Sequence, residues 1–523
     1  MPELNRVKNR IEQLLQRQDW QEILKIFKRE KLSPGLDEEL DYYFALANFF
    51  LGRLLIAEPI LQDLSAKYPE RYEAALFLAR CKLLKRRSDQ AFAIAAKAPK
   101  PEKDFYFLDM AGTIFSHTGR PDMALPYLES AASLAAAPTG ALSNLAICNL
   151  HLGNIDRAKN YFRKIIEIEP HNQRAHWQLA KIQKASDFSH IETMKENIRQ
   201  RNLEPHNTVF YQFAIAKQLE DLKYWDESFA YYQAASSIVR QRLNYRIDID
   251  ERIIDDIIAT SERSINSGAI LTKHDNKSGE GCIFITGLPR SGTSLLDQIL
   301  SSHTQISSAG ELQTIEAALK EHYSTPHLTG FQIGKAVATE GIDLHKTYLD
   351  RTRYLRSNKP WMIDKLPHNY LYLGVIAQQL PEAKLVHITR SPVDSCFAMF
   401  KQLFASQYQF SYSLMDLAGY YAAYSKLMNF WRSTLGNRLI EVKYEELVSN
   451  PEREIGKLLA RLGFDFEESC LSPHKARRPV MTASSHQVRE AINTNSVGKY
   501  QNFIDHLAPL IDDLERRGIP TQI

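Results

Sequence analysis

The sequence predicts two kinds of domain, an all-α repeat array in the first half and an α/β domain with a parallel sheet in the second. Three observations lead to this fold class. Helix–turn–helix segments recur with a period of about 34 residues before residue 250. A polar stretch at 271–281 then precedes the β-branched run 282–287. A glycine-bearing loop and a helical pattern follow that run, which is the order of strand, anion-binding turn and helix in α/β proteins.

Length and composition favour a globular protein of several domains. The chain has 523 residues, too many for one ordinary core, with 44% hydrophobic and 24% charged residues. A formal net charge of +3 argues against a nucleic-acid partner, which requires a strongly basic face. The five cysteines are widely spaced and form no CxxC pair, which favours a reducing compartment. The start of the chain has no apolar signal segment, and no membrane span is expected, so we predict a soluble, cytoplasmic protein.

The repeats are clearest at Gly119 and Gly153, which lie 34 residues apart, each with an alanine five positions later (Ala124 and Ala158). The same phase recurs at Gly52 with Ala57, at Arg86 with Ala91, and at Lys223 with Ser228. This pattern resembles tetratricopeptide repeats, in which small residues let paired helices approach closely. A generic helical bundle is the alternative, and 175–205 matches the period poorly. We predict a tetratricopeptide-type solenoid over 1–250 and a connecting segment over 251–281.

The loop Gly287-Leu288-Pro289-Arg290-Ser291-Gly292-Thr293-Ser294 indicates what the second domain (282–523) binds. Its glycines have the spacing of a Walker A loop, GxxxxGK[ST], but Thr293 stands in the lysine position. Without that lysine, nucleoside-triphosphate chemistry is disfavoured. Arg290 lies inside the loop, where its forked guanidinium can bridge a phosphate and a transferring sulfuryl group.

This loop and the motifs that follow it in order resemble the PAPS-dependent sulfotransferases, within them the tyrosylprotein and bacterial repeat-containing branch, whose loop reads PRSGT[TS]L. The resemblance runs from about Ile283 to Phe503. It implies a P-loop-like sulfotransferase domain that transfers a sulfuryl group from PAPS to a hydroxyl acceptor without a metal. The residues implied to bind the 5′ end of PAPS are Pro289, Arg290, Ser291, Gly292, Thr293 and Ser294.

The resemblance also implies catalytic residues downstream. Glu311 matches the base of tyrosylprotein sulfotransferases, which takes the proton of the acceptor hydroxyl, although an acid at a helix N-terminus is the alternative. Lys365 matches the lysine that reaches the bridging oxygen of the donor, where it and Arg290 stabilise charge on the leaving phosphate. The serine that assists the sulfuryl group matches Ser484, and a one-residue shift would select Ser485.

Three further residues match the other end of the donor site. Arg390, after the strand-like run KLVHIT, and Lys499 match residues on the 3′-phosphate side. Tyr444 lies in IEVKYEEL, expected as a strand, and matches a position near the adenine. Ala398 occupies the place of a family serine, which predicts weaker 3′-phosphate binding. Ordinary structural roles for Arg390 and Tyr444 are the alternatives.

Two other functions fit parts of the sequence. A phosphotransferase could use the same loop on ATP, although the missing lysine counts against it. A non-catalytic repeat scaffold with a decayed sulfotransferase domain would explain Ala398, although Arg290, Glu311 and Lys365 are retained. The acceptor is open between a protein tyrosine, a carbohydrate hydroxyl and a small phenol. The repeats favour a peptide or protein acceptor held on their concave face.

Overall fold

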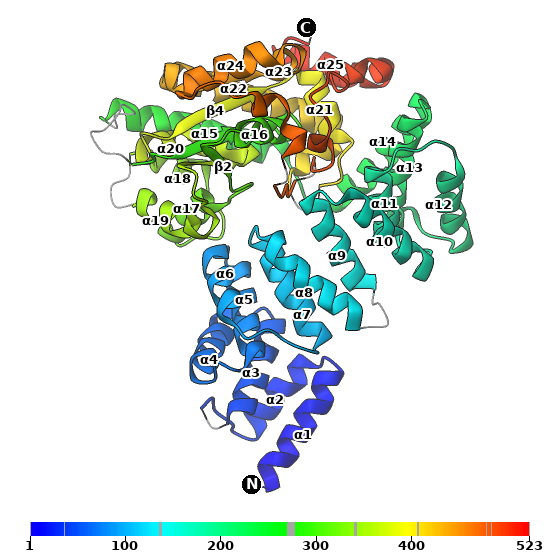
Figure 1. Ribbon diagram of the computed structural model, residues 1–523, viewed down its shortest axis with the longest axis vertical. Helices are drawn as coiled ribbons and strands as arrows, with labels where there is room; N and C mark the ends of the chain where they lie inside the picture. Colours follow the sequence, from blue (N-terminus) through cyan, green and yellow to red (C-terminus); the bar gives the residue numbers. More distant parts are fainter. Residues whose placement is uncertain are drawn as a thin grey trace. The chain divides into compact units, whose positions relative to one another are not determined.

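The computed structural model describes residues 2–35, 37–134, 139–268, 278–338, 343–404, 407–476, 478–482 and 484–521 (Figure 1). The structure separates into two compact units, Met1–Cys148 and Asn149–Ile523. Most of the polar stretch predicted at 271–281 lies outside the described residues. In the part of the chain that the structure describes, no helix has the length and apolar character needed to cross a membrane.

The first unit is built from successive helix pairs, as the repeat pattern predicts. The pairs are α1 (Pro2–Gln16) with α2 (Trp20–Arg29), α3 (Glu38–Phe50) with α4 (Leu54–Lys67), α5 (Tyr72–Leu84) with α6 (Ser88–Lys97), and α7 (Phe105–His117) with α8 (Pro121–Leu134). Helix α9 (Thr139–Leu152) begins in this unit. The predicted all-α first half is confirmed.

The turn between the paired helices explains the repeating glycines. Gly52, Gly119 and Gly153 take the left-handed conformation, with φ of 74°, 83° and 85°. Arg86 and Lys223 adopt it at the same position with φ of 59° and 67°, although side chains disfavour this region. The small residues five positions later are fully buried, namely Ala57, Ala91, Ala124, Ala158 and Ser228. The 34-residue period of the sequence therefore reflects a left-handed turn that recurs between the two helices of successive pairs.

The second unit continues the array before the sheet begins. Its repeat helices are α10 (Ile155–Ile168), α11 (Gln173–Ile182), α12 (Ser189–Gln200), α13 (Val209–Asp221) and α14 (Trp225–Arg242). Phe229 of α14 shares one hydrophobic core with the sheet domain, and its ring centroid lies 5.9 Å from that of Phe400. The segment 251–281, predicted as a connection, holds most of α15 (Ile247–Asn266). Helix α15 packs against α18 (Gly330–Lys335) and α22 (Leu414–Leu435).

The sheet is five-stranded and parallel, in the order β2-β3-β1-β4-β5, which confirms the predicted α/β domain. The strands are β1 (Cys282–Thr286), β2 (Ile306–Ser308), β3 (Trp361–Lys365), β4 (Lys384–Thr389) and β5 (Leu439–Lys443). In register, Phe284 of β1 lies beside Asp364 of β3 and Leu385 of β4. The chain runs from β1 to β2 on one side and from β3 to β4 on the other. The chain leaves β4 for β5 on that same other side, so the loops after the neighbouring strands β1 and β4 lead in opposite directions, which is where such sheets bind ligands.

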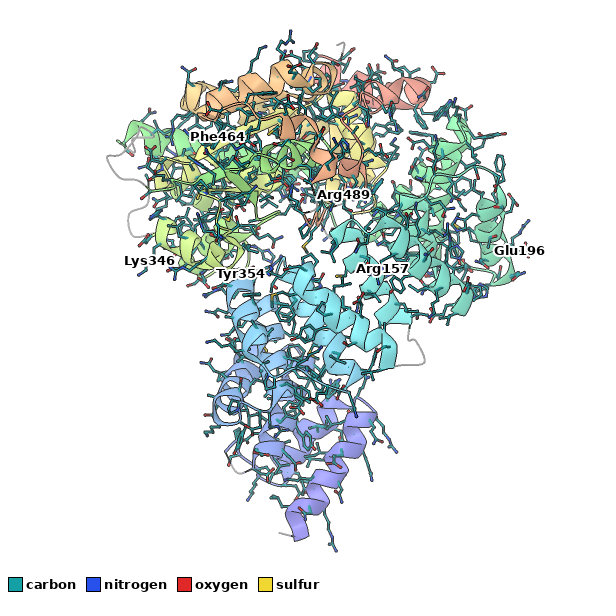
Figure 2. All side chains as sticks on the ribbon, viewed as in Figure 1. Arg157, Glu196, Lys346, Tyr354, Phe464 and Arg489 are labelled. Atoms are coloured by element: carbon teal, nitrogen blue, oxygen red, sulfur yellow. The ribbon has the colours of Figure 1, made fainter. Side chains whose placement is uncertain are left out.

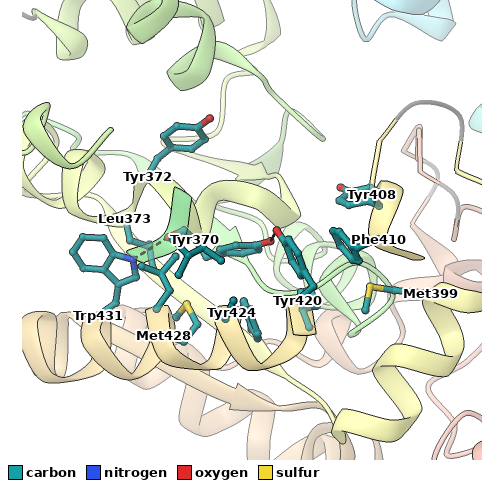
Figure 3. Close-up of a cluster of buried hydrophobic side chains, with 14 of the residues drawn as sticks. Tyr370, Tyr372, Leu373, Met399, Tyr408, Phe410, Tyr420, Tyr424, Met428 and Trp431 are labelled. Carbon is teal, nitrogen blue, oxygen red and sulfur yellow. Dashed lines mark hydrogen bonds between the residues drawn. The ribbon is translucent and has the colours of Figure 1, made fainter. Parts of the chain in front are cut away.

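Alternate residues of the strands point to opposite faces of the sheet, and the side chains of each face pack in a separate hydrophobic core. Phe284, Met362 and Leu385 join a core that includes α15, α20 (Leu373–Gln379) and α22. Part of this core is drawn in Figure 3, where the Tyr370 and Tyr420 hydroxyls lie 2.5 Å apart and Trp431 Nε1 donates to the Tyr370 carbonyl at 3.0 Å. The opposite faces of the strands pack with α16 (Thr293–Ser301) and α24 (Pro451–Leu462). The strands are thus buried on both faces, as parallel strands usually are.

One predicted strand is too long. The run IEVKYEEL was expected to be extended throughout, but β5 ends at Lys443 and α23 (Tyr444–Ser449) begins directly after it. The Glu445 carboxylate accepts a hydrogen bond from the Ser391 backbone N–H at 2.8 Å. This contact ties the first turn of α23 to the loop after β4. Tyr444 therefore opens a helix and is buried at the carboxyl edge of the sheet.

The remaining α-helices complete the second unit. They are α17 (Thr314–His322), α19 (Leu344–Thr352), α21 (Pro392–Phe400) and α25 (Ile504–Arg516). Helix α21 starts two residues after Arg390, and α17 starts three residues after Glu311. Both helices therefore follow predicted site residues closely.

Candidate functional site

The loop between β1 and α16 has the backbone of an anion-binding turn. Arg290 and Gly292 both take positive φ, of 67° and 104°. Positive φ values within a short loop turn successive backbone N–H groups to one side, which creates a concavity for phosphate or sulfate. Gly292 also admits a close neighbour, because a Cβ there would lie 2.5 Å from a ring carbon of Tyr444. Ser291 and Thr293 are buried within this turn.

Arg290 is held on both sides by polar groups. Its Nη1 donates to the Ser484 hydroxyl, and its Nη2 donates to Gln487 Oε1 at 2.7 Å. Its backbone carbonyl accepts a hydrogen bond from Arg390 Nη1 at 3.0 Å. Burial and the nearby charge of Arg390 lower the pKa of Arg290 to about 10. Two neighbouring guanidinium groups without a shared carboxylate make a site that favours an anion.

Arg390 lies at the end of β4 and closes the opposite side of the loop. Its Nη2 donates to the Ser496 carbonyl, and its guanidinium lies 5.0 Å from the centre of the Tyr444 ring. Asp394 on α21 approaches it at 3.7 Å. The Nε atoms of Arg290 and Arg390 are buried and have no hydrogen-bond partner among the described residues. The structure thus brings Arg290, Arg390 and Tyr444 together.

Lys365 and Glu311 form the second part of the site. Lys365, the last residue of β3, is fully buried, and its Nζ donates to Glu311 Oε1. The Glu311 side chain is 32% exposed, so it reaches outward from the sheet edge. The loop that carries it is held to β3, since Lys365 N donates to the Gly310 carbonyl at 2.9 Å. A buried cation therefore contacts an accessible carboxylate.

Asp364 supports this end of β3 from inside the core. It accepts hydrogen bonds from the Tyr348 hydroxyl at 3.0 Å and from Asn369 Nδ2 at 3.3 Å. Burial nevertheless raises its pKa to about 7. The loop after β3 also touches the loop after β1, because Thr286 Oγ1 donates to the Pro367 carbonyl at 2.8 Å. This contact links the two parts of the site.

The other predicted site residues are placed as follows. Ser484 contacts Arg290 through its hydroxyl, whereas the neighbouring Ser485 is buried. Ser294 Oγ lies 3.1 Å from Thr482 Oγ1. Lys499 is exposed and lies between Gly498 and Tyr500, whose backbone N–H groups donate to Asp394 at 2.7 and 3.4 Å. Ala398 lies half-buried on α21. Pro289 lies buried in the β1 loop between Leu288 and Arg290.

Sequence reasoning missed several polar groups near these residues. Asp394 anchors both Arg390 and the Lys499 loop, and Gln487 contacts Arg290. Lys181 on α11 lies 4.3 Å from the centre of the Trp177 ring. Burial and the charge of Arg290 lower the pKa of Lys181 to about 8. A repeat helix therefore brings a positive charge within electrostatic range of Arg290, which lies 109 residues further along the chain and which no local motif could signal.

A metal cluster is not evident in the described part of the chain. None of its groups of three or more His, Cys, Asp or Glu side chains has an arrangement suited to a metal ion. The polar atoms that the loops present are instead hydroxyls, guanidinium groups and backbone amides. Such donors suit a phosphate or sulfate ester.

The fold and the site define an α/β domain with guanidinium, ammonium and hydroxyl groups at the carboxyl edge of its sheet, preceded by helical repeats. Residues 282–468 match the family model described as "Sulfotransferase family", and residues 117–182 match the model described as "Tetratricopeptide repeat". The chain therefore contains a sulfotransferase-family domain and tetratricopeptide repeats.

Two relatives and one solved structure are similar to parts of this chain. An uncharacterized protein of Aquifex aeolicus (strain VF5) is 28% identical over 389 residues, which cover 72% of this chain and 50% of the relative. The chain thus spans half the length of that protein. A Caenorhabditis briggsae protein named "Putative protein-tyrosine sulfotransferase" is 23% identical over 246 residues, 45% of this chain and 86% of the relative. The solved "Sulfotransferase Domain from the Curacin Biosynthetic Pathway" is 20% identical, with a TM-score of 0.35, and covers 46% of this chain and 99% of its own.

Proposed function

We propose that this chain transfers a sulfuryl group from PAPS to a hydroxyl acceptor. The observation that carries the proposal is the contact between buried Lys365 and the accessible carboxylate of Glu311, beside the loop of Arg290. Sulfuryl transfer needs both groups together. A base must take the acceptor proton, and a cation must stabilise the negative charge that develops on the departing phosphate.

The reaction assigns a separate task to each group. As the acceptor oxygen forms its bond to sulfur, the bond between sulfur and the phosphate oxygen breaks, and its electron pair stays on the phosphate. Glu311 accepts the proton of the acceptor hydroxyl. Lys365 and Arg290 supply positive charge to the phosphate oxygen, and Ser484 orients Arg290 through its hydroxyl.

The polar atoms of the site fit a donor with several negative charges. Buried side-chain atoms that lack a partner among the described residues gather here, namely Arg290 Nε, Ser291 Oγ, Arg390 Nε and Ser391 Oγ. Buried polar groups normally have hydrogen-bond partners, so these atoms favour a ligand with many acceptor oxygens. Arg390, Tyr444 and Lys499 would hold the 3′-phosphate and adenine end. Gly292, Thr293 and Ser294 would hold the 5′ end with Pro289 shaping the turn.

The rest of the chain supports proposals for the acceptor and for the cellular setting. Tetratricopeptide repeats are suited to protein interaction, so we propose a peptide or protein acceptor, with tyrosine or carbohydrate hydroxyls as the chemical targets. All five cysteines are buried free thiols. Free thiols fit a reducing compartment, and we therefore propose a cytoplasmic protein.

The first experiment is a calorimetric titration with adenosine 3′,5′-bisphosphate, with and without Mg²⁺, followed by transfer of labelled sulfate from PAPS to phenolic, peptide and carbohydrate acceptors. We expect binding that does not require Mg²⁺, and transfer to at least one acceptor. Arg390→Ala should weaken binding, whereas exposed Arg461→Ala on α24 should not. Binding of ATP only with Mg²⁺ would favour a phosphotransferase, and no nucleotide binding would favour a repeat scaffold.

A further inference from the structure

A segment near the C-terminus lies across the donor loop. This closing segment comprises the described residues of 473–489, between α24 and α25. Its first part is bound to α16, since Gln298 Nε2 donates to the Pro473 carbonyl at 3.0 Å and Arg478 Nη2 donates to Asp297 Oδ2 at 2.5 Å. Its later part contacts the loop itself, because Ser484 and Gln487 accept hydrogen bonds from Arg290. The closing segment therefore sets the orientation of the Arg290 guanidinium.

The same segment is bound on another side by the repeats. The last turn of α9 presents the His151 carbonyl, two residues before Gly153, and it accepts hydrogen bonds from Val480 N at 2.8 Å and from Arg489 Nη2 at 3.4 Å. Arg489, labelled in Figure 2, also donates to the Ala476 carbonyl at 2.9 Å and to the Arg478 carbonyl at 2.6 Å. One guanidinium thus joins two parts of the closing segment to a repeat turn.

Gly153 lets this guanidinium lie against the turn. A Cβ at Gly153 would be 2.9 Å from Arg489 Cζ, closer than real contacts allow. Gly52 occupies the equivalent turn of an earlier repeat with φ of 74°, close to the 85° of Gly153, yet a Cβ there would meet nothing within 4 Å. The left-handed backbone explains glycine at both positions. The contact with Arg489 distinguishes Gly153.

We propose that Arg489 is a positioning residue for sulfuryl transfer, which uses the repeat turn at His151 and Gly153 to hold the closing segment over Arg290. The proposal rests on the function proposed above. It gives the repeats a part in the transfer step: their turn supports the segment whose Ser484 and Gln487 fix Arg290. Arg489 itself has no described contact with Arg290, so it acts through that segment.

A positioning role predicts a particular pattern of kinetic effects. Loss of Arg489 should leave the backbone of the 287–293 turn in place, so the affinity for adenosine 3′,5′-bisphosphate should change less than about threefold. Misorientation of Arg290 should instead lower kcat for sulfuryl transfer, by about 10- to 100-fold, because small misplacements of catalytic groups have effects of that size. A residue needed only for folding would not separate these two quantities.

The experiment uses the full chain and four variants. Arg489→Ala and Gly153→Ala should each lower kcat, and Arg489→Lys should restore part of it, since an ammonium still donates to carbonyls but lacks the planar fork. Gly52→Ala is the matched control. It places the same strain in a repeat turn without a neighbour, so its kcat should stay within twofold of the wild type.

A second measurement does not depend on activity. Trypsin cleavage after exposed Lys475 should be faster in Arg489→Ala and Gly153→Ala than in the wild type and Gly52→Ala, because loss of the Arg489 bond to the Ala476 carbonyl releases the closing segment. The proposal is overturned if Arg489→Ala keeps kcat within twofold, or if Gly52→Ala loses as much kcat as Gly153→Ala. If the wild type transfers no sulfate to any acceptor, the proposed function fails. Unchanged proteolysis in Arg489→Ala would separately refute the positioning role of Arg489, whatever the activity of the protein.

Discussion

Lys365 and Glu311 form an ion pair in which the lysine side chain is fully buried and the carboxylate is partly exposed. The lysine ends a central strand of the sheet, and the glutamate reaches it from the loop after β2. Burial fixes the ammonium at the sheet edge, whereas exposure leaves the carboxylate accessible to an acceptor. In the reaction proposed above, this asymmetry assigns charge stabilisation to Lys365 and proton removal to Glu311.

Glu311→Gln should therefore lower kcat by about 10²- to 10⁴-fold, the usual contribution of a general base. The amide oxygen can still accept a hydrogen bond from Lys365, so the variant should fold and bind adenosine 3′,5′-bisphosphate. Initial transfer rates at saturating PAPS test this. Glu316→Gln on α17 is the control, because Glu316 pairs with Lys320. A Glu311→Gln rate within tenfold of the wild type would rule out the base assignment.

Gly292→Ala should damage the donor loop more than its backbone strain explains. The new Cβ would lie 2.5 Å from the Tyr444 ring, and φ is 104°. Gly463→Ala shares the left-handed backbone, with φ of 81°, but meets nothing within 4 Å. We expect a loss of about 1 kcal/mol in the free energy of unfolding for Gly463→Ala and of 2–4 kcal/mol for Gly292→Ala. Only Gly292→Ala should weaken bisphosphate binding in calorimetry, and equal effects would contradict this account.

Local sequence patterns were enough to predict the order of the two domains, the turns of the repeats and the first strand of the sheet. The glycine phase of the repeats reflects one left-handed turn, and the run 282–287 with the loop after it became β1 and its anion-binding turn. Both features are encoded within a few neighbouring residues. Where a boundary depended on a distant segment, the pattern failed: β5 ends at Lys443, which pairs with Thr389, the last residue of β4, and Glu445 then binds the loop after β4.

The candidate site likewise contains residues that local motifs predicted and residues that they did not. The motifs selected Arg290, Glu311, Lys365 and Arg390, each at the end of a strand or in the loop that follows it. Their polar neighbours could not be found from sequence, because they come from distant segments. Gln487 reaches Arg290 from 197 residues away, and Arg489 reaches His151 from 338. Such contacts exist only once the sheet and the repeats have packed together.

Lys181→Met should weaken the binding of adenosine 3′,5′-bisphosphate about tenfold, the effect of losing one charged contact of moderate strength. Methionine keeps an unbranched apolar side chain and removes the ammonium that lies over the Trp177 ring. Burial and Arg290 lower the pKa of Lys181 to about 8, so its ammonium is charged below pH 8 and neutral above it. Wild-type affinity should therefore fall as the pH rises through 8.

Calorimetry between pH 7 and 9 tests this prediction, and the fall in affinity should be absent in Lys181→Met. His486 does not change charge in this range, because burial and nearby cations lower its pKa to about 3. Exposed Lys184→Met, three residues further on, is the control. A Lys181→Met protein with wild-type affinity at pH 7 would remove Lys181 from the site.

Glu220→Gln should destabilise the junction between the repeats and the sheet domain. Glu220 on α13 pairs with Lys401, directly after α21, at 2.7 Å, and both side chains are largely buried. Burial alone would raise the pKa of Glu220, but the charge of Lys401 outweighs it and leaves the pKa below 4.5. The stabilisation is therefore present above pH 4.5 and is lost as the pH falls further. Glu220→Gln leaves Lys401 without its counter-charge and should lower the free energy of unfolding by about 3 kcal/mol at pH 7.

The exposed pair of Lys426 and Asp255 is the control, and Asp255→Asn should lower the free energy of unfolding by less than about 1 kcal/mol. Unfolding in guanidinium chloride at pH 7 and at pH 4 measures the free energy of unfolding of each variant. The difference in this free energy between Glu220→Gln and the wild type should be smaller at pH 4 than at pH 7. A difference that stays constant would show that packing, and not the ion pair, holds α13 against α21.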